Sequence, residues 1–254
     1  MSNIPEKEQL PSYNELRAAR NPPSLSPELN RVFWSLDGPF PESIWIMESC
    51  GNTDSLEPYL QGDDGKQSWH PAAQAPLTEP KVSSVTVYVS DMEDWENDWL
   101  EFHRDHSERC AGNEQYCDGE LSVVYGELPD YNEEEDEEED EDEEGEPGHL
   151  LMCCTSPRPR GKTGGMVVKP TTGDFVTVHD YLSTLHPWLL SKRDDVLISK
   201  GMYDDKPLPQ ETKLMVNCGW GDSLNICEQA EWIEFKQQVA RKVMRQQSSS
   251  GRLW

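Results

Sequence analysis

The stretch Val82–Val89, with the sequence VSSVTVYV, decides the fold class of this 254-residue chain. Its last three valines alternate with Thr and Tyr, and this period of two predicts a strand that is buried on one face. Ser90 and Glu93 follow at once, and their Ser-x-x-Glu spacing predicts a capping box that opens a helix. A strand that leads directly into a helix indicates a protein of mixed α and β structure.

The helix predicted after Ser90 carries a stripe of large apolar side chains. Successive members of the stripe are three or four residues apart, so they share one face of a helix. They are Met92, Trp95, Trp99 and Phe102. A face of this kind is typical of a helix that packs against a core.

Further stretches of strand and helix length lie on both sides of this region. The predicted strands are 43–47, 121–125, 150–154, 166–169, 175–178 and 213–218, and the predicted helices follow Thr177 and span 194–200 and 229–247. Neighbouring strands are close enough to form hairpins, and no regular βαβ repeat is present. This order favours an α+β fold with a mostly antiparallel sheet and helices packed on one face.

Two of these helices carry features that make specific predictions. Thr177 and Asp180 form a second, weaker capping box. Pro187 lacks the amide hydrogen that a continuing helix needs, which predicts a kink or a restart near His186. The apolar side expected for the last helix consists of Trp232, Phe235, Val239 and Val243.

The charge and composition exclude several classes of protein. Asp and Glu number 49 against 22 Lys and Arg, so the formal net charge is −27. A chain this acidic repels nucleic acids and anionic lipids, so we expect no direct nucleic-acid binding. No stretch approaches the roughly 18–20 consecutive apolar residues of a membrane span. Nine Trp residues argue against a fully disordered chain.

The acidic residues are concentrated in Glu133–Glu144, where twelve of them follow one another. Such a run repels itself and buries no apolar surface, which predicts an acidic disordered insertion over 126–148. The strands expected at 121–125 and 150–154 flank it as the arms of an expanded hairpin. The run would attract basic proteins as partners; a solubilising linker without a dedicated partner is the open alternative.

The prolines, glycines and charge runs predict one main domain. Residues 1–28 are expected to form a flexible N-terminal arm, because five prolines interrupt any long helix there. A single α+β domain is expected over 29–247, with a polar loop at 54–80 and the acidic insertion at 126–148. Residues 248–254 are expected to be a flexible C-terminus.

The best candidate for a metal site is the series His103-x2-His106-x3-Cys110-x6-Cys117. Zinc takes four nitrogen and sulfur ligands in a tetrahedron, and these four residues would be sufficient. The C-x2-C pair of many structural zinc sites is absent, however. The open alternative is the polar end of a helix followed by two ordinary thiols.

The seven cysteines are an odd number spread over a long chain, unlike a secreted disulfide framework. The polar start of the sequence also lacks the apolar core of a signal peptide. We therefore expect reduced thiols and a cytoplasmic or nuclear location. Cys153 and Cys154 are expected to be small buried apolar residues.

No motif of catalysis is complete in the sequence. RGKTG at Arg160–Gly164 resembles the end of a phosphate-binding loop, but Ser156 stands where the first glycine is needed. Cys153, Cys154 and Ser183 are conceivable nucleophiles and His179 a conceivable base, yet G-x-S-x-G and H-E-x-x-H are absent. The sequence favours a non-enzymatic binding or scaffold module. A hydrolase-like small-molecule enzyme with an unidentified site is the alternative.

The segment 175–196, FVTVHDYLSTLHPWLLSKRDDV, together with SIWIM at 43–47, resembles uncharacterised intracellular proteins of fungi. The shared features are a Thr-Val-x-Asp turn from strand to helix, an apolar stripe and a Trp after Pro. The resemblance implies a fungal intracellular domain and assigns no catalytic or binding residue.

Overall fold

The computed structural model describes residues 10–62, 65–112, 123–128, 148–159, 164–202, 206–219 and 221–250, without the side chains of 105–112 and 243–250. The chain forms two compact units. Unit 1 consists of Met1–Asp91 and Thr163–Trp254, and unit 2 consists of Met92–Lys162. The single domain expected over 29–247 is therefore replaced by two units, of which the second is inserted into the first.

A four-stranded sheet forms the centre of unit 1. Its strands lie in the order β12 (Met166–Val168), β8 (Val85–Val89), β14 (Ser223–Glu228) and β13 (Leu214–Cys218). β8 pairs antiparallel with β12 and parallel with β14, and β13 and β14 form an antiparallel hairpin. The three valines of β8 are buried and the residues between them are half-buried, as their period of two predicted. Together with the helices, this sheet confirms the α+β class.

The pairing of β8 with β12 explains why unit 2 is an insertion. β8 ends shortly before unit 2 begins, and β12 starts shortly after unit 2 ends. In the antiparallel register, Val87 lies opposite Met166, so the pairing brings both ends of the insertion together. Loop-closure entropy grows only slowly with length, so a paired strand end tolerates a long insertion.

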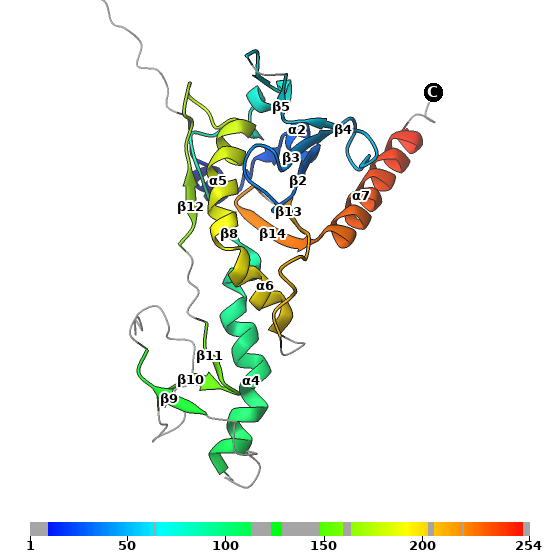
Figure 1. Cartoon of the computed structure of the whole chain (residues 1–254). Helices are drawn as coiled ribbons and strands as arrows, with labels where there is room; N and C mark the ends of the chain where they lie inside the picture. Colours follow the sequence, from blue (N-terminus) through cyan, green and yellow to red (C-terminus); the bar gives the residue numbers. More distant parts are fainter. Residues whose placement is uncertain are drawn as a thin grey trace, which may run out of the picture. The chain divides into compact units, whose positions relative to one another are not determined.

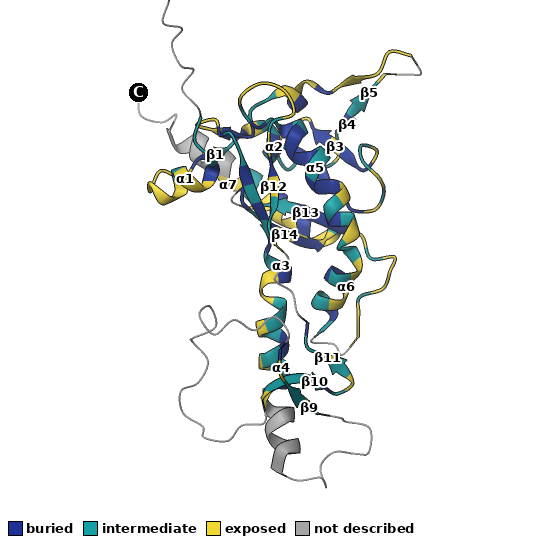
Figure 2. Ribbon diagram, turned by 90° about the vertical axis from the view of Figure 1, so that its left-hand side faces the viewer, coloured by how far each residue is buried: buried dark blue, intermediate teal, exposed yellow. Residues whose placement is uncertain are grey.

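The sheet of unit 1 is buried on both faces, whereas helices on one face were expected. Met215 and Cys227 are paired across β13 and β14, and they pack with Trp232 of α7 (Gln229–Ser250). The residues that alternate with this pair point to the opposite face and are also buried: Leu214, Val216, Leu224 and Ile226. Consecutive apolar residues are typical of strands that are covered on both sides. Figure 2 shows these strands largely in the colour of buried residues.

A second sheet of unit 1 consists of β2 (Val32–Trp34), β3 (Ile44–Met47) and β4 (Leu56–Pro58), all antiparallel. β3 confirms the strand predicted at 43–47. The chain that leaves β2 reaches the edge of β13, where the N–H of Leu36 donates to the carbonyl of Leu214 at 2.9 Å. This bond satisfies backbone groups at the edge of β13.

Residues 10–28 differ from the flexible arm that was expected. They contain α1 (Tyr13–Ala18) and β1 (Ser24–Leu25), and α2 (Pro27–Asn30) follows. Tyr13 is buried, and its N–H donates to the carbonyl of Ser84 at 2.9 Å. Ser12 and Glu15 form a capping box that the neighbouring prolines obscure in the sequence.

The polar segment 54–80 also has more structure than the loop that was expected. Besides β4 it contains β5 (Leu60–Gln61), β6 (Ser68–Trp69), the 3₁₀ helix η1 (Pro71–Gln74) and β7 (Thr78–Glu79). A few residues of this segment, without a regular spacing, are fully buried: Tyr59, Ala73, Leu77 and Thr78. Their positions follow neither the period of a strand nor that of a helix, which is why composition alone predicted a loop.

The helices after Thr177 follow the prediction at their start but not in their middle. α5 (Val178–Ser191) begins with the predicted capping box, in which Asp180 is the reciprocal acceptor. The helix continues through Pro187, and the break comes just before α6 (Arg193–Gly201). The buried side of α5 continues on both sides of the proline. Its packing outweighs the one backbone hydrogen bond that the proline removes.

The last helix buries a different side from the one expected. Trp232 is fully buried, but Phe235 is 46% exposed and Lys236 only 7% exposed. The ammonium of Lys236 lies 5.2 Å from the centre of the Trp232 ring, within the range of a cation–π contact. A lysine stem is long enough to cover apolar surface, which the pattern of apolar residues does not show.

Unit 2 contains one long helix and a small sheet. The helix is α4 (Trp95–Gly112), which follows the single turn α3 (Ser90–Glu93). The sheet has β10 (His149–Cys153) at its centre, between β9 (Val124–Gly126) and β11 (Ser156–Pro157), all antiparallel. Figure 1 shows α4 beside β10 and β11.

The pairing of β9 with β10 confirms the expanded hairpin predicted around the acidic run. Gly126 lies opposite His149, so the two ends of the intervening segment are adjacent. The run Glu133–Glu144 itself lies outside the described residues, and its predicted disorder stays a prediction.

We predict that Asp180→Asn destabilises unit 1 by about 1–3 kcal/mol, since an amide cannot accept all four bonds that the carboxylate accepts. These bonds come from the N–H and hydroxyl groups of Thr171 and Thr177, at 2.6–2.9 Å. Burial raises the pKa of Asp180, but these bonds outweigh it and hold the pKa below the ordinary value. The stabilisation is therefore complete above pH ~4, the ordinary carboxyl pKa, and is lost as the pH falls further.

Urea denaturation of both proteins at pH 7 and at pH 3 measures this difference. The gap between wild type and variant should be largest at pH 7 and smaller at pH 3. Asp54→Asn, on an exposed residue, is the control. A gap that stays constant between the two pH values would contradict the prediction.

Candidate metal centre

Helix α4 presents one face to the hairpin formed by β10 and β11. Glu96, Trp99 and His103 are three and four residues apart, so they share that face. Each of the three contacts a different part of the hairpin or of the residues next to it. Trp99 and His103 are almost completely buried. Of the stripe predicted from the sequence, Met92 and Trp99 are buried, but Trp95 and Phe102 are only half-buried, so the packing face is displaced toward Glu96 and His103.

The first contact is an ion pair between Glu96 and Arg158. The Arg158 Nε donates to the Glu96 Oε1 at 2.6 Å, and the side chains are only 17% and 9% exposed for Glu96 and Arg158. A buried charge that loses its partner is costly, so this pair fixes the start of α4 against the residues after β11.

The second contact orients the imidazole of His103. The indole N–H of Trp99 donates to the hydroxyl of Ser156 at 3.1 Å. The Trp99 ring also lies against the His103 ring, with 4.5 Å between ring centroids. The Phe102 ring lies edge-on to the same imidazole, with 5.1 Å between the ring centroids. Two aromatic neighbours restrict the rotation of the His103 side chain.

The hairpin turn between β10 and β11 has an unusual backbone. Its two central residues, Cys154 and Thr155, have φ values of 51° and 61°. Positive φ at both positions matches the two-residue turn that suits a hairpin, but Gly and Asn are the residues that normally occupy it. A cysteine and a β-branched threonine are strained there, and strain of this kind occurs often at functional sites.

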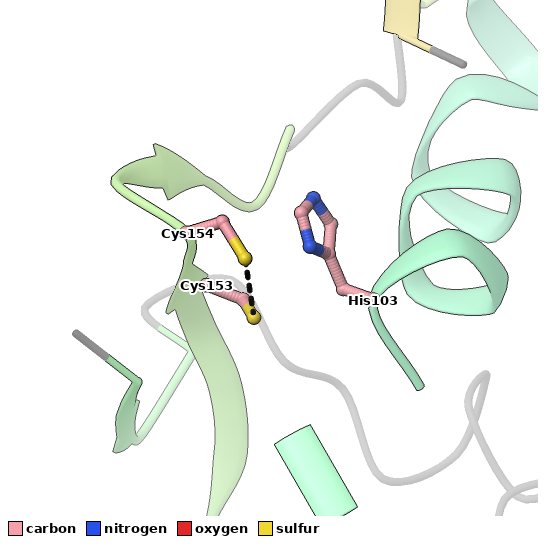
Figure 3. A group of neighbouring side chains, drawn as sticks. All are labelled: His103, Cys153 and Cys154. Atoms are coloured by element: carbon pink, nitrogen blue, oxygen red, sulfur yellow. Dashed lines mark hydrogen bonds between the residues drawn. The ribbon is translucent and has the colours of Figure 1, made fainter. Parts of the chain in front are cut away.

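The third contact brings together three metal-ligand side chains. A ring nitrogen of His103 and the Sγ atoms of Cys153 and Cys154 all lie within 4.8 Å of one another. The two sulfur atoms are 3.6 Å apart. Figure 3 shows the imidazole, from α4, facing both sulfur atoms at the end of β10. His103 and Cys153 are 3% and 1% exposed, so bulk water has little access to the cluster.

Burial decides the protonation of one of these ligands. Desolvation, with a smaller effect of the adjacent Cys154, raises the pKa of the Cys153 thiol to about 12. The thiol therefore keeps its proton at neutral pH and is a poor nucleophile. A metal ion would displace that proton, as it does whenever a thiol becomes a ligand.

The structure includes one of the four predicted metal ligands in this cluster. His103 takes part, whereas the side chains of His106 and Cys110, within α4, and the whole of Cys117 lie outside the described residues. Cys153 and Cys154 were not predicted as ligands, because fifty residues separate them from His103. The available signal was two adjacent cysteines at the predicted end of a strand.

The contacts described for Ser183 and His179, which were named for a hydrolase, do not join the Ser183 hydroxyl to the His179 ring. The hydroxyl of Ser183 donates to the backbone carbonyl of His179 at 2.7 Å. The Nδ1 of His179 lies 3.1 Å from the hydroxyl of Tyr59. Nucleophilic catalysis needs a hydrogen bond between nucleophile and base, and the bonds described for the Ser183 hydroxyl and for the Nδ1 of His179 go to other groups.

Comparisons with protein-family models, with curated proteins and with solved structures find no match for this chain. The resemblance of 175–196 to fungal proteins therefore stays a prediction. Among the described residues, every helix is too short or too polar to cross a lipid bilayer.

We predict that Glu96→Gln loosens unit 2 more than the double variant Glu96→Gln with Arg158→Met. The single variant leaves the guanidinium of Arg158 buried without a carboxylate, and the loss of one partner costs about 3–5 kcal/mol in buried ion pairs. Here the cost should lie at or below the lower end, because both side chains are slightly exposed. Amide hydrogen exchange of β10 measures it, and equal protection in both variants would contradict the argument.

Proposed function

We propose that unit 2 is a non-enzymatic binding module that holds a zinc ion through His103, Cys153 and Cys154. The single observation that supports this proposal is the convergence of one imidazole and two thiols within 4.8 Å, with His103 and Cys153 buried and Cys154 half-buried. One ligand comes from α4 and two come from the β10 end, so the ion joins the two parts of the unit.

The spacing of the sulfur atoms suits tetrahedral zinc. Two Zn–S bonds of about 2.3 Å that span the observed 3.6 Å would enclose an angle of about 103°, close to the tetrahedral value. Sulfur and nitrogen donors also favour zinc or monovalent copper over magnesium and calcium, which bind oxygen. The remaining position of the tetrahedron would take a fourth donor, for which His106, Cys110 and Cys117 are the candidates from the sequence.

The partner that we propose for this module is a basic protein that binds the acidic run Glu133–Glu144. This run is part of the segment that connects β9 to β10, and the paired residues Gly126 and His149 fix where that segment leaves and rejoins the sheet. Twelve adjacent acids attract cationic chains over a distance set by ionic strength. We also propose a reducing location, the cytoplasm or the nucleus, where the cysteines would stay free thiols.

We predict that the full chain binds one zinc ion and that Cys153→Ser, Cys154→Ser and His103→Ala each weaken binding severely. The loss of zinc affinity should exceed the roughly 10–100-fold that is typical when a residue that hydrogen-bonds to a metal ligand is replaced. Calorimetric titration with zinc sulfate in the presence of a phosphine reductant measures the affinity. Affinity should rise with pH, because the thiols must lose protons.

Cys50→Ser is the matched control for these variants, since Cys50 belongs to unit 1 and is not part of the cluster. It should bind zinc as the wild type does. Equal zinc affinity in all four variants and the wild type would contradict the proposed site.

We predict that a lysine-rich synthetic peptide binds the full chain and that salt weakens this binding. Replacement of the acids of Glu133–Glu144 by Gln and Asn should abolish it, because the attraction is electrostatic. Fluorescence anisotropy of the labelled peptide, at several salt concentrations, measures the affinity. A peptide with glutamine in place of lysine is the control, and unchanged binding by the neutralised variant would contradict the role of the run.

A further inference from the structure

Among the residues whose side chains are described, buried apolar ones are less frequent in unit 2 than in unit 1. Buried apolar residues number four among the 31 residues of unit 2 whose side chains are described, and 33 among the 155 of unit 1. The four are Met92, Trp99, Leu128 and Cys153. Figure 2 shows the same contrast, with α5 and the central strands of unit 1 mostly in the colour of buried residues and β9–β11 mostly not.

Unit 1 has the buried core and the strand pairing of a domain that folds alone. Its strands β8, β13 and β14 bury apolar residues on both faces of one sheet. Its two chain segments are also joined directly, since β8 precedes unit 2 and pairs with β12 and β14, which follow it. Burial of apolar surface is the main favourable contribution to folding, and unit 1 obtains it from its own residues.

The described part of unit 2 buries few apolar residues, and the described contacts within it are mostly polar. Glu96 with Arg158, and Trp99 with Ser156, join α4 to the hairpin. Hydrogen bonds and ion pairs replace bonds to water and contribute little net stability. Small units with few buried apolar residues usually need a disulfide or a metal ion to fold.

The turn at Cys154 and Thr155 also indicates that unit 2 needs a bound ion. Two non-glycine residues with positive φ raise the free energy of the hairpin, and such a conformation persists only where the surroundings fix it. Cys154 lies at this turn, so a metal bond to its sulfur would fix the backbone at its strained position.

We infer that zinc binding and the folding of unit 2 are a single equilibrium, while unit 1 folds without zinc. This inference rests on the zinc site proposed above and adds its regulation. Without the ion, the entropy of ordering α4 and the hairpin is not compensated. With the ion, its binding free energy becomes folding free energy of the unit.

Zinc would then decide whether β9 and β10 pair. That pairing places Gly126 opposite His149, where the segment between them leaves and rejoins the sheet. The availability of zinc would thereby control the pairing of β9 with β10 and leave the sheet of unit 1 unchanged.

Amide hydrogen exchange of the full chain, with zinc sulfate or with a chelator, tests the inference. We expect the amides of β10 and of 99–103 in α4 to exchange at least 100-fold more slowly with zinc than with the chelator. The amides of β13 and β14 should exchange equally slowly in both conditions. Cys50→Ser should behave as the wild type, and the double variant Cys153→Ser with Cys154→Ser should stay unprotected with zinc.

The outcomes separate this inference from the proposed function. If calorimetry shows zinc binding at the cluster but β10 is equally protected with and without the ion, the coupling is wrong and the zinc site stands. If zinc does not bind the wild type, both are wrong. Loss of protection in β13 and β14 on chelation would show that unit 1 also depends on the ion, and would overturn the inference.

Discussion

The antiparallel pairing of β8 with β12 is the constraint on which the arrangement of the chain depends. It brings together the two points where unit 2 leaves and re-enters unit 1. The same device is repeated inside unit 2, where β9 pairs with β10 around the segment that contains the acidic run. Each pairing makes a long excursion compatible with a compact body, because only the closure of its ends is costly.

The two units differ in what stabilises them. Unit 1 has strands with consecutive apolar residues that are covered on both faces, and its polar interior groups, such as Asp180, are satisfied by hydrogen bonds. In the described part of unit 2, one helix face contacts the hairpin through an ion pair, an indole hydrogen bond and the His103 cluster. A metal ion at that cluster would supply the stabilisation that apolar burial supplies in unit 1.

The local sequence pattern predicted where helices and strands lie better than it predicted which of their residues are buried. The valines of β8, the capping box at Thr177 and the strands on both sides of the acidic run are features of neighbouring residues, and the structure confirms them. Tyr59 is buried in a polar segment, and Lys236 is buried over Trp232 where Phe235 was expected. These two positions depend on which distant surface covers the residue, and no periodicity records that.

The sequence by itself determined the class of the fold and the hairpin around the acidic run, and it placed His103, the proposed metal ligand, on the helix rich in tryptophan. Only the tertiary structure decided that Cys153 and Cys154 are its neighbours. The physical reason is that ligands on one helix or turn are related by a fixed spacing. Ligands on a helix and a distant hairpin meet only through packing, here that of Glu96 and Trp99 against the hairpin.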